Sequence, residues 1–233
     1  MTSLLHSAEL SGGTIVSDGL IEPAESCLLL VSAENTLRGS LQQFIQEGFA
    51  THFQAKVQYF MPHLLGVSQA GQWQAVLGIR FAAGNTLFTE QYLGASAQQV
   101  MASYDTGCQR ADIAEIGHLY ACSSHALMQL FVLMLQALHQ LQLKYLLFAA
   151  TNDLNTLLTR HGLNLIRLAE ADPACLGSKA ADWGSYYQRE PAVYMLSVAQ
   201  AASRIHSDRR LQHLIFRHWP QLHILVDNLR GAC

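Results

Sequence analysis

Apolar and polar positions in the first half of the chain predict three strands and one helix. Residues 27–31 form a continuous apolar run of strand length. Residues 37–49 place apolar side chains at every third or fourth position, which is typical of an amphipathic helix. Two more strand-like runs, residues 63–68 and 73–81, are separated by a short gap in which Gly71 favours a hairpin turn. This half of the chain is therefore expected to pair in antiparallel fashion.

The second half alternates strands with helices. We expect, in order, strand 113–120, helix 123–141, strand 144–151, helix 152–161, strand 163–168 and strand 192–198. Gly162 is well placed to end the second of these helices in a left-handed conformation. Alternating strands and helices favour parallel pairing through right-handed crossovers. Joined to the antiparallel first half, they predict an α/β fold with one mixed sheet.

Three segments are expected along the chain. Residues 1–25 are rich in serine and glycine and predict a flexible segment. Residues 26–199 hold the strands and helices described above. Residues 200–233 predict a helical extension that carries several arginines. These arginines suit either a solvated helix face or a contact between two copies in a homodimer.

Composition and charge exclude several classes of protein. Half of the 233 residues are hydrophobic, which is sufficient for a large buried core, and the net charge of −3 gives no basic face for nucleic acid. The most hydrophobic stretch, residues 126–138, is shorter than the roughly 20 residues that a helix needs to cross a bilayer. The N-terminus lacks a signal-peptide pattern, and the five cysteines are scattered. We expect a cytoplasmic protein with no integral membrane span.

Several short strings recur, in the same order, in one bacterial family. They are Phe60-Met61-Pro62, VLGIR at 76–80, LFTEQYL at 87–93, EIGHL at 115–119, FAAT at 148–151 followed by Gly162-Leu163, and ADP at 171–173 followed by WGSYY at 183–187. Together they resemble the thermostable hemolysin family over about residues 45 to 195. The resemblance implies a GNAT-like (N-acyltransferase) fold, with helices on both faces of the sheet and a C-terminal helical extension. It also implies a more distant similarity to acyl-homoserine lactone autoinducer synthases.

The segment before the central helix departs from ordinary acyltransferases. Those enzymes place a glycine-rich loop there, so that backbone N–H groups meet the donor pyrophosphate at the helix N-terminus. Residues 121–126 contain no glycine, which leaves Ser123 and Ser124 as the candidate contacts to the donor. Autoinducer synthases also lack that pattern. The resemblance therefore implies a long-chain acyl thioester, acyl-CoA or acyl-carrier protein, as co-substrate, and no tightly bound cofactor.

Two carboxylates are the leading catalytic candidates. Amide formation needs a base for the amine and donors for the developing oxyanion. Glu90 and Glu115 both lie in apolar, strand-like segments, although residues 87–93 also suit an extended loop. Burial raises the pKa of a carboxyl group toward a useful range. If the two segments are neighbours, the carboxylates form a pair that acts as base or anchors the acceptor. The alternative is that each is half-exposed or pairs with an arginine such as Arg80.

His118 and Tyr92 are further candidates. His118 lies three residues after Glu115 on one strand, so the two side chains point to opposite faces unless a bulge at Gly117 redirects one of them. His118 is then a base, a substrate contact or a satisfied structural histidine. Tyr92 either supplies a proton to the departing thiolate, as tyrosines do in many acyltransferases, or packs as a half-buried aromatic.

The remaining candidates are expected to contact substrate. Trp183, Tyr186 and Tyr187 lie in a polar-aromatic loop that either lines an acceptor or acyl pocket or is simply held in place by its aromatics. Arg80, Gln91 and His118 complete this set. No metal is expected, because the chain has no H-E-x-x-H string, and the histidines at 213, 218 and 223 step by five rather than four.

We therefore expect an enzyme, an N-acyltransferase that moves a fatty acyl group from its thioester donor to a small amine-bearing acceptor. Two alternatives stay open. One is a membrane-active hemolysin, as the family name states. The other is a non-catalytic protein that binds an acyl ligand.

Overall fold

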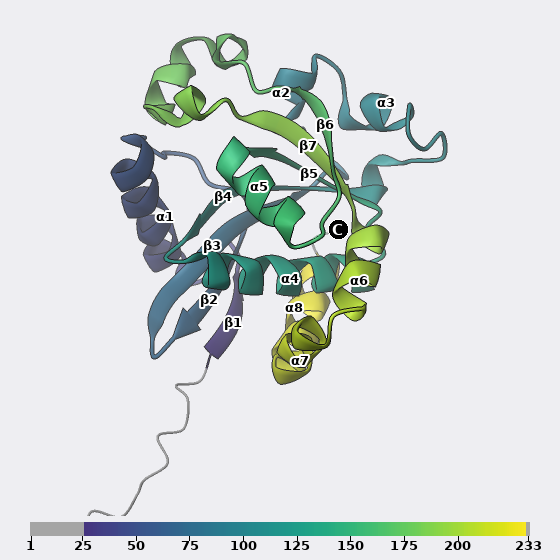
Figure 1. Ribbon diagram of the computed structural model, residues 1–233. Coiled ribbons are helices and arrows are strands. Elements are labelled where there is room, and N and C mark those ends of the chain that lie inside the picture. The colour runs from purple at the N-terminus through teal and green to yellow at the C-terminus, as the bar shows by residue number, and fades with distance from the viewer. Residues whose placement is uncertain (1–25, 232–233) are drawn as a thin grey trace, which may run out of the picture.

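One mixed sheet of seven strands organises the part of the chain that the structure describes, residues 26–231, in the computed structural model (Figure 1). Across the sheet the strands are β1 (Ser26–Val31), β2 (His63–Gln69), β3 (Gln72–Phe81), β4 (Ile113–Ala121), β5 (Tyr145–Ala150), β7 (Ala192–Ser197) and β6 (Leu165–Glu170). Only β4 and β5 pair in parallel. The predicted mixed sheet is confirmed, and the predicted flexible segment, residues 1–25, lies outside the described residues.

Helices cover both faces of this sheet. On one face lies α1 (Arg38–Phe53), whose Leu41 and Ile45 pack with Leu64 of β2. On the other face lie α4 (Ser124–Gln140), α5 (Asn152–Arg160), α6 (Val198–His206), α7 (Arg209–Arg217) and α8 (Trp219–Arg230). Because successive strand residues point to opposite faces, neighbouring Leu64 and Leu65 enter different halves of the core.

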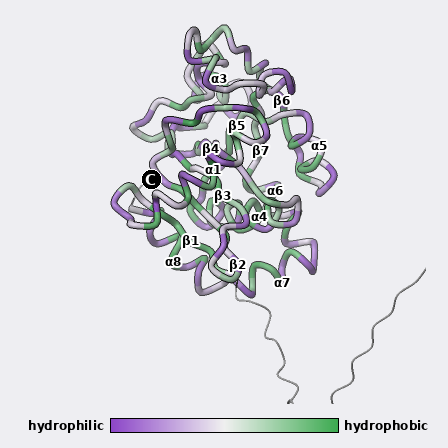
Figure 2. The backbone as a smooth tube through the Cα atoms, turned by 90° about the vertical axis from the view of Figure 1, so that its left-hand side faces the viewer, coloured by the Kyte–Doolittle hydropathy of each residue, from purple (hydrophilic) through white to green (hydrophobic). Residues whose placement is uncertain are grey.

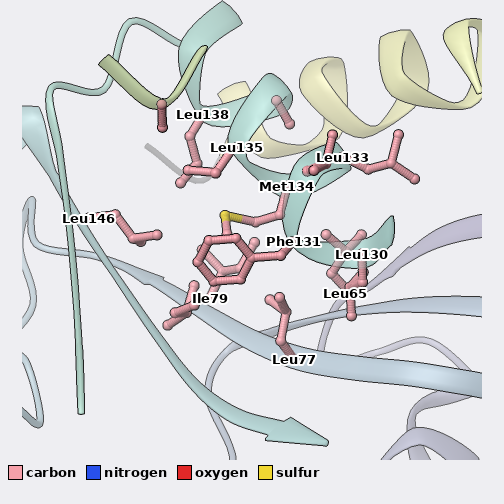
Figure 3. Packing of buried hydrophobic residues seen from close by; sticks show 14 of the residues in the cluster. Leu65, Leu77, Ile79, Leu130, Phe131, Leu133, Met134, Leu135, Leu138 and Leu146 are labelled. Carbon is pink, nitrogen blue, oxygen red and sulfur yellow. The ribbon is translucent and has the colours of Figure 1, made fainter. Parts of the chain in front are cut away.

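The central helix α4 holds the larger half of the core together. Figure 3 shows Phe131 and Met134 of α4 directed toward strand residues such as Ile79 and Leu77. Each fully buried side chain of this size contributes about 1.5–3 kcal/mol relative to its exposed state. This packing fixes the positions of β3 and β4, which carry the candidate site residues.

The C-terminal helices share that core. Four apolar side chains of α8, Leu222, Leu225, Val226 and Leu229, belong to the same buried cluster as α4. Figure 2 shows mostly hydrophobic colouring where α8 lies beside β1. The side-chain oxygen of Gln221 accepts a hydrogen bond from the backbone N–H of Leu28 at 3.1 Å. Within residues 26–231, no helix has both the length and the apolar character needed to cross a bilayer.

Two turn predictions are confirmed by backbone angles. Ala70 and Gly71 have φ of 50° and 75°, the pair of left-handed residues that a tight β2–β3 hairpin requires. Gly162 has φ of 81° and follows α5. Its N–H donates to the carbonyl oxygen of Thr159 at 2.8 Å, as expected for a helix-ending glycine.

Residues 87–93 are not a strand. They form a short loop followed by α2 (Glu90–Leu93), which Gly94 ends in a left-handed conformation, and α3 (Ala97–Met101) follows. The partial alternation of LFTEQYL fits a single helical turn equally well. The predicted polar-aromatic loop contains 3₁₀ turns within Pro173–Trp183 and Tyr186–Arg189, and a third 3₁₀ turn, Arg110–Asp112, precedes β4.

Two glycines of α1 differ sharply in their surroundings. A Cβ atom on Gly48 would lie 2.4 Å from the Tyr120 ring, whereas Gly39 has open space around it. We expect Gly48→Ala to lower the free energy of unfolding by about 1–3 kcal/mol, because overpacking outweighs the roughly 1 kcal/mol gain in helix propensity. Gly39→Ala, the matched control, is expected to be neutral or stabilising. Equal urea-unfolding midpoints for the two variants would contradict this packing.

Candidate active site

Strands β4 and β5 separate after a short parallel contact. Their last pair is Glu115 with Leu147, and no further pair joins them within the described chain. The diverging ends, residues 116–119 of β4 and residues 148–151 at the end of β5, line a cavity of about 390 Å³. Beyond Glu115, the β5-facing edge of β4 therefore borders a cavity rather than another strand.

A β-bulge shapes the β4 side of the cavity. The register with β3 shifts between Gly117 and Tyr120, so His118 and Leu119 together oppose a single residue of β3. His118 has φ of 54°, a left-handed conformation that is uncommon for any residue with a side chain. The bulge brings His118 to the cavity that Glu115 also lines. A bulge was the condition that the sequence analysis set for bringing the Glu115 and His118 side chains to one site, and that bulge is present.

Glu115 is the buried anchor of the site, with 1% of its side chain exposed. One carboxylate oxygen accepts hydrogen bonds from the Thr89 N–H at 2.6 Å and the Thr89 hydroxyl at 2.7 Å, and the other accepts from the Phe88 N–H at 3.0 Å. Arg80 Nη1 lies 3.7 Å from the second oxygen. Burial raises the pKa of Glu115, although these hydrogen bonds and Arg80 oppose the rise. Its carboxylate holds the Phe88–Thr89 loop against β4.

Glu90 has a different role from the one predicted. Its carboxylate accepts hydrogen bonds from the N–H groups of Leu87 at 2.8 Å and Ala97 at 2.6 Å, and Arg110 Nη1 lies 2.6 Å away. Burial opposes its ionisation, but Arg110 and the two N–H donors outweigh burial and lower the pKa of Glu90. The prediction of two carboxylates on neighbouring strands is wrong, because Glu90 begins α2. Residues 88, 89, 91 and 92 line the cavity, whereas Glu90 is outside the lining.

Aromatic side chains form a wall of the cavity. Tyr186 packs edge-on against Phe53 with ring centres 5.3 Å apart, and Trp183 lies 5.5 Å from Tyr186 and 5.9 Å from Phe88. Two main-chain hydrogen bonds fix this loop to the end of α1. The N–H of Ser185 donates to the carbonyl of Phe53 at 2.7 Å, and that of Lys56 donates to the carbonyl of Asp182 at 2.6 Å.

Tyr92 and Tyr187 face the same cavity as a hydrogen-bonded pair, with their hydroxyl oxygens 2.7 Å apart. Burial raises the pKa of Tyr92 far above its ordinary value, and its bond with Tyr187 adds to that rise. Burial likewise raises the pKa of Tyr187 and of Tyr186. At neutral pH these phenols are protonated, so they are able to donate hydrogen bonds to a ligand.

His118 is neutral in this setting. Burial and the positive charge of Arg80 lower its pKa to about 4, although a hydrogen bond with the main chain of Tyr59 opposes the change. Its Nδ1 atom is buried and has no hydrogen-bond partner among residues 26–231. The described residues therefore do not satisfy the whole ring, and the role of His118 stays a prediction.

The remaining candidates divide into two groups. Arg80 and Gln91 line the cavity, together with the three loop aromatics. Ser123 and Ser124 are outside the lining. The Ser123 hydroxyl instead accepts a hydrogen bond from the N–H of Ala126 at 3.2 Å, capping the first turn of α4, and Ser124 is exposed. Donor binding by these serines stays a prediction.

Sequence reasoning missed the α1 side of the cavity. Phe49, Phe53, Tyr59 and Phe60 all line it, as do the exposed side chains of Lys56 and Lys179. The available signal was the density of aromatic residues between positions 49 and 60, which exceeds what one buried helix face requires. Contact with the loop that holds Trp183 was not readable, because it joins segments about 130 positions apart.

A family model described as thermostable hemolysin matches residues 31–202. The chain belongs to the thermostable hemolysin family. The family resemblance read from the short strings is thus confirmed, over a somewhat longer stretch than those strings covered. No curated protein matches this chain in sequence.

Solved structures similar to this thermostable hemolysin family member are acyl-transferring synthases. FeeM, an N-acyl amino acid synthase from uncultured soil microbes, is 12% identical with a TM-score of 0.56, covering 78% of this chain and 95% of its own. The acyl-homoserine lactone synthase LasI is 12% identical with a TM-score of 0.51, covering 75% and 91%. BjaI, a CoA-dependent acyl-homoserine lactone synthase solved with SAM and isopentyl-CoA, is 10% identical with a TM-score of 0.52, covering 85% and 90%. These matches confirm the GNAT-like fold.

The lowered pKa of Glu90 links its ion pair to stability. A carboxyl group whose pKa is lower in the folded than in the unfolded chain stabilises the fold above its ordinary pKa of 4.5, and this contribution is lost as pH falls through the folded value. We expect Glu90→Gln to cost about 1–3 kcal/mol at pH 7, the value of hydrogen bonds to a charged group. The difference from the unaltered protein should shrink below about pH 4.5, as measured by urea unfolding across pH.

The exposed pair of Asp227 and Arg230 provides the control. Asp227→Asn should change stability by less than about 1 kcal/mol, because exposed ion pairs contribute little. A pH-independent effect of Glu90→Gln would show that the carboxylate charge is not what holds the α2 loop.

Proposed function

We propose that this protein transfers an acyl group from a thioester donor to a small amine-bearing acceptor. The observation that carries the proposal is the cavity between the diverging strands β4 and β5, which joins an aromatic wall to a polar group of Glu115, Arg80 and His118. Its volume of about 390 Å³ lies within the usual range for small-molecule sites. The similar solved structures, described as acyl-homoserine lactone and N-acyl amino acid synthases, support the same class of reaction.

The apolar part of the cavity suits the acyl chain. Phe49, Phe53 and Trp183 from the aromatic wall, with Leu119 and Leu127 from the β4–α4 side, surround it with side chains that gain from excluding water. A fatty chain buries more of this surface than an acetyl group does. We therefore infer a fatty acyl donor, acyl-CoA or acyl-carrier protein, used as co-substrate.

The polar part suits the reacting groups. Arg80 is loosely held, by the Thr86 carbonyl at 3.3 Å and by Glu115, so its guanidinium retains N–H groups for the acceptor. Main-chain N–H groups on the open edge of β4 are our candidates for binding the thioester carbonyl, where charge develops during attack. The protonated hydroxyls of Tyr92 and Tyr187 line the same cavity and are able to donate a hydrogen bond to the leaving sulfur.

Thiol release tests this proposal directly. Purified protein should release thiol from acyl-CoA or acyl-carrier protein in the presence of an amine, faster with fatty than with acetyl donors because longer chains fill the aromatic cavity. Mass spectrometry should detect the matching amide. Donor binding without thiol release, across a broad panel of amines, would indicate a non-catalytic acyl-binding protein. Leakage of liposomes caused by the pure protein alone would favour the membrane-active alternative.

Glu115→Gln tests the polar part of the cavity. A glutamine amide cannot accept hydrogen bonds through its nitrogen, so either the Phe88 N–H or the two Thr89 donors lose their acceptor, and Arg80 loses its counter-charge. We expect kcat/KM for acyl transfer to fall about 10²-fold or more, the scale of losing a positioned electrostatic group. Glu170→Gln, at an exposed position of β6, is the matched control and should retain full activity. Circular dichroism spectra of both variants should match the unaltered protein, and full activity of a folded Glu115→Gln variant would contradict the assignment.

A further inference from the structure

Among the described residues, His118 Nδ1 is the only buried side-chain nitrogen or oxygen of the cavity lining that has no hydrogen-bond partner. A buried polar atom without a partner costs about 1–3 kcal/mol. The left-handed backbone of His118 adds a second cost of similar size. A leucine at position 118 would remove the unpaired nitrogen, and a glycine there would remove the backbone strain. Two destabilising features at one residue of the cavity lining indicate that this residue contacts a ligand.

Packing fixes the ring in this position. The methionine side chain of Met61 fills the space beside the bulge, so that a Cβ atom on Gly117 or on Gly78 would lie 2.8 Å from it. The ring of Phe60 lies 5.6 Å from the imidazole. Met61 and Phe60 thus pack closely around the bulge that carries His118.

The neighbouring polar groups are already engaged. Both oxygens of Glu115 accept hydrogen bonds from the Phe88–Thr89 loop, and the hydroxyls of Tyr92 and Tyr187 bond to each other. Arg80 carries no acceptor atom. His118 Nδ1 is the buried side-chain atom of the cavity lining that no described residue engages, which leaves it available to accept a proton.

We propose that His118 Nδ1 takes the proton of the acceptor amine during acyl transfer, an assignment that rests on the proposed function above. The amine nitrogen forms a C–N bond to the thioester carbonyl carbon, and its N–H proton moves to Nδ1. The C–S bond then breaks with its electron pair on sulfur, and the proton passes from the imidazolium to the thiolate. The products are an amide, a thiol and a neutral histidine, so no further reactant is needed.

The electrostatic setting is consistent with this role. The pKa of His118, lowered to about 4, keeps the ring in its free-base form at neutral pH. A weak base is adequate at this step, because the nitrogen of the tetrahedral adduct is positively charged and gives up its proton far more readily than a free ammonium ion does.

Replacement of the ring by a soluble base tests the proposal. His118→Gly suits the left-handed backbone, so this variant should fold, and it leaves an imidazole-sized space open to the cavity. With the donor–amine pair that gives the fastest thiol release in the unaltered protein, we expect kcat to fall about 10²- to 10⁴-fold. Added imidazole should restore at least about tenfold of that loss. Pyrazole, a ring of the same size but far weaker as a base, should not.

Two further variants separate proton transfer from binding. Asparagine tolerates the left-handed backbone and accepts a hydrogen bond, so His118→Asn should keep KM within about threefold while kcat falls by about 10²-fold or more. His63→Asn is the control, because His63 also has a pKa lowered by burial but lies outside the cavity lining, and its kcat should be unchanged.

The outcomes are distinguishable. Absence of thiol release by the unaltered protein, with every donor and amine, would overturn the proposed acyl transfer itself. An active protein whose His118→Gly variant keeps its kcat would overturn the role of His118 alone. Equal rescue by imidazole and pyrazole would also overturn it, because the ring would then serve only to fill space.

Discussion

The buried carboxylate of Glu115 is the interaction on which the site depends. It occupies the last position at which β4 pairs with β5, so it marks the point where the two strands part. Its two oxygens also accept hydrogen bonds from the N–H groups of Phe88 and Thr89 and from the Thr89 hydroxyl. This residue thereby marks the end of the parallel ladder, and its side chain holds the loop that leads into α2 beside the cavity.

Burying that charge requires a rigid surrounding. An isolated carboxylate in an apolar interior is strongly disfavoured, and three short hydrogen bonds offset the penalty only while their geometry is maintained. The α4 side chains that pack on β3 and β4 supply that rigidity from the opposite face. The second carboxylate, Glu90, holds the far end of the loop in place by accepting hydrogen bonds from Arg110 and from the N–H of Ala97. The two ends of this loop are thus held by different glutamates.

The fold was more readable from the sequence than the site. Periodicity along residues 63–81 and 113–161 reflects local burial, so it predicted the hairpin and the strand–helix alternation. The prediction for residues 87–93 failed because seven residues fit a strand and a helical turn equally well. Arg110, the partner of Glu90 that decides between the two structures, is 20 positions away in the sequence. The dependence of His118 on a bulge was visible in the spacing. Its unpaired nitrogen was not, because it depends on residues from several distant elements.

Among the described residues, several groups with free hydrogen-bonding capacity lie where the sheet opens. On the core side of the sheet, β3 and β4 are sealed by α4 and their ladder is continuous up to the bulge. Where β4 parts from β5, an open strand edge, an unpartnered imidazole nitrogen and a loosely held guanidinium all border one cavity. A ligand that brings a carbonyl oxygen, an N–H group or an anion would form hydrogen bonds with these groups. A cavity that served only to bind hydrocarbon would gain nothing from them. Their convergence beside the aromatic wall is therefore the physical reason for regarding this site as a place where polar chemistry is carried out on an apolar substrate.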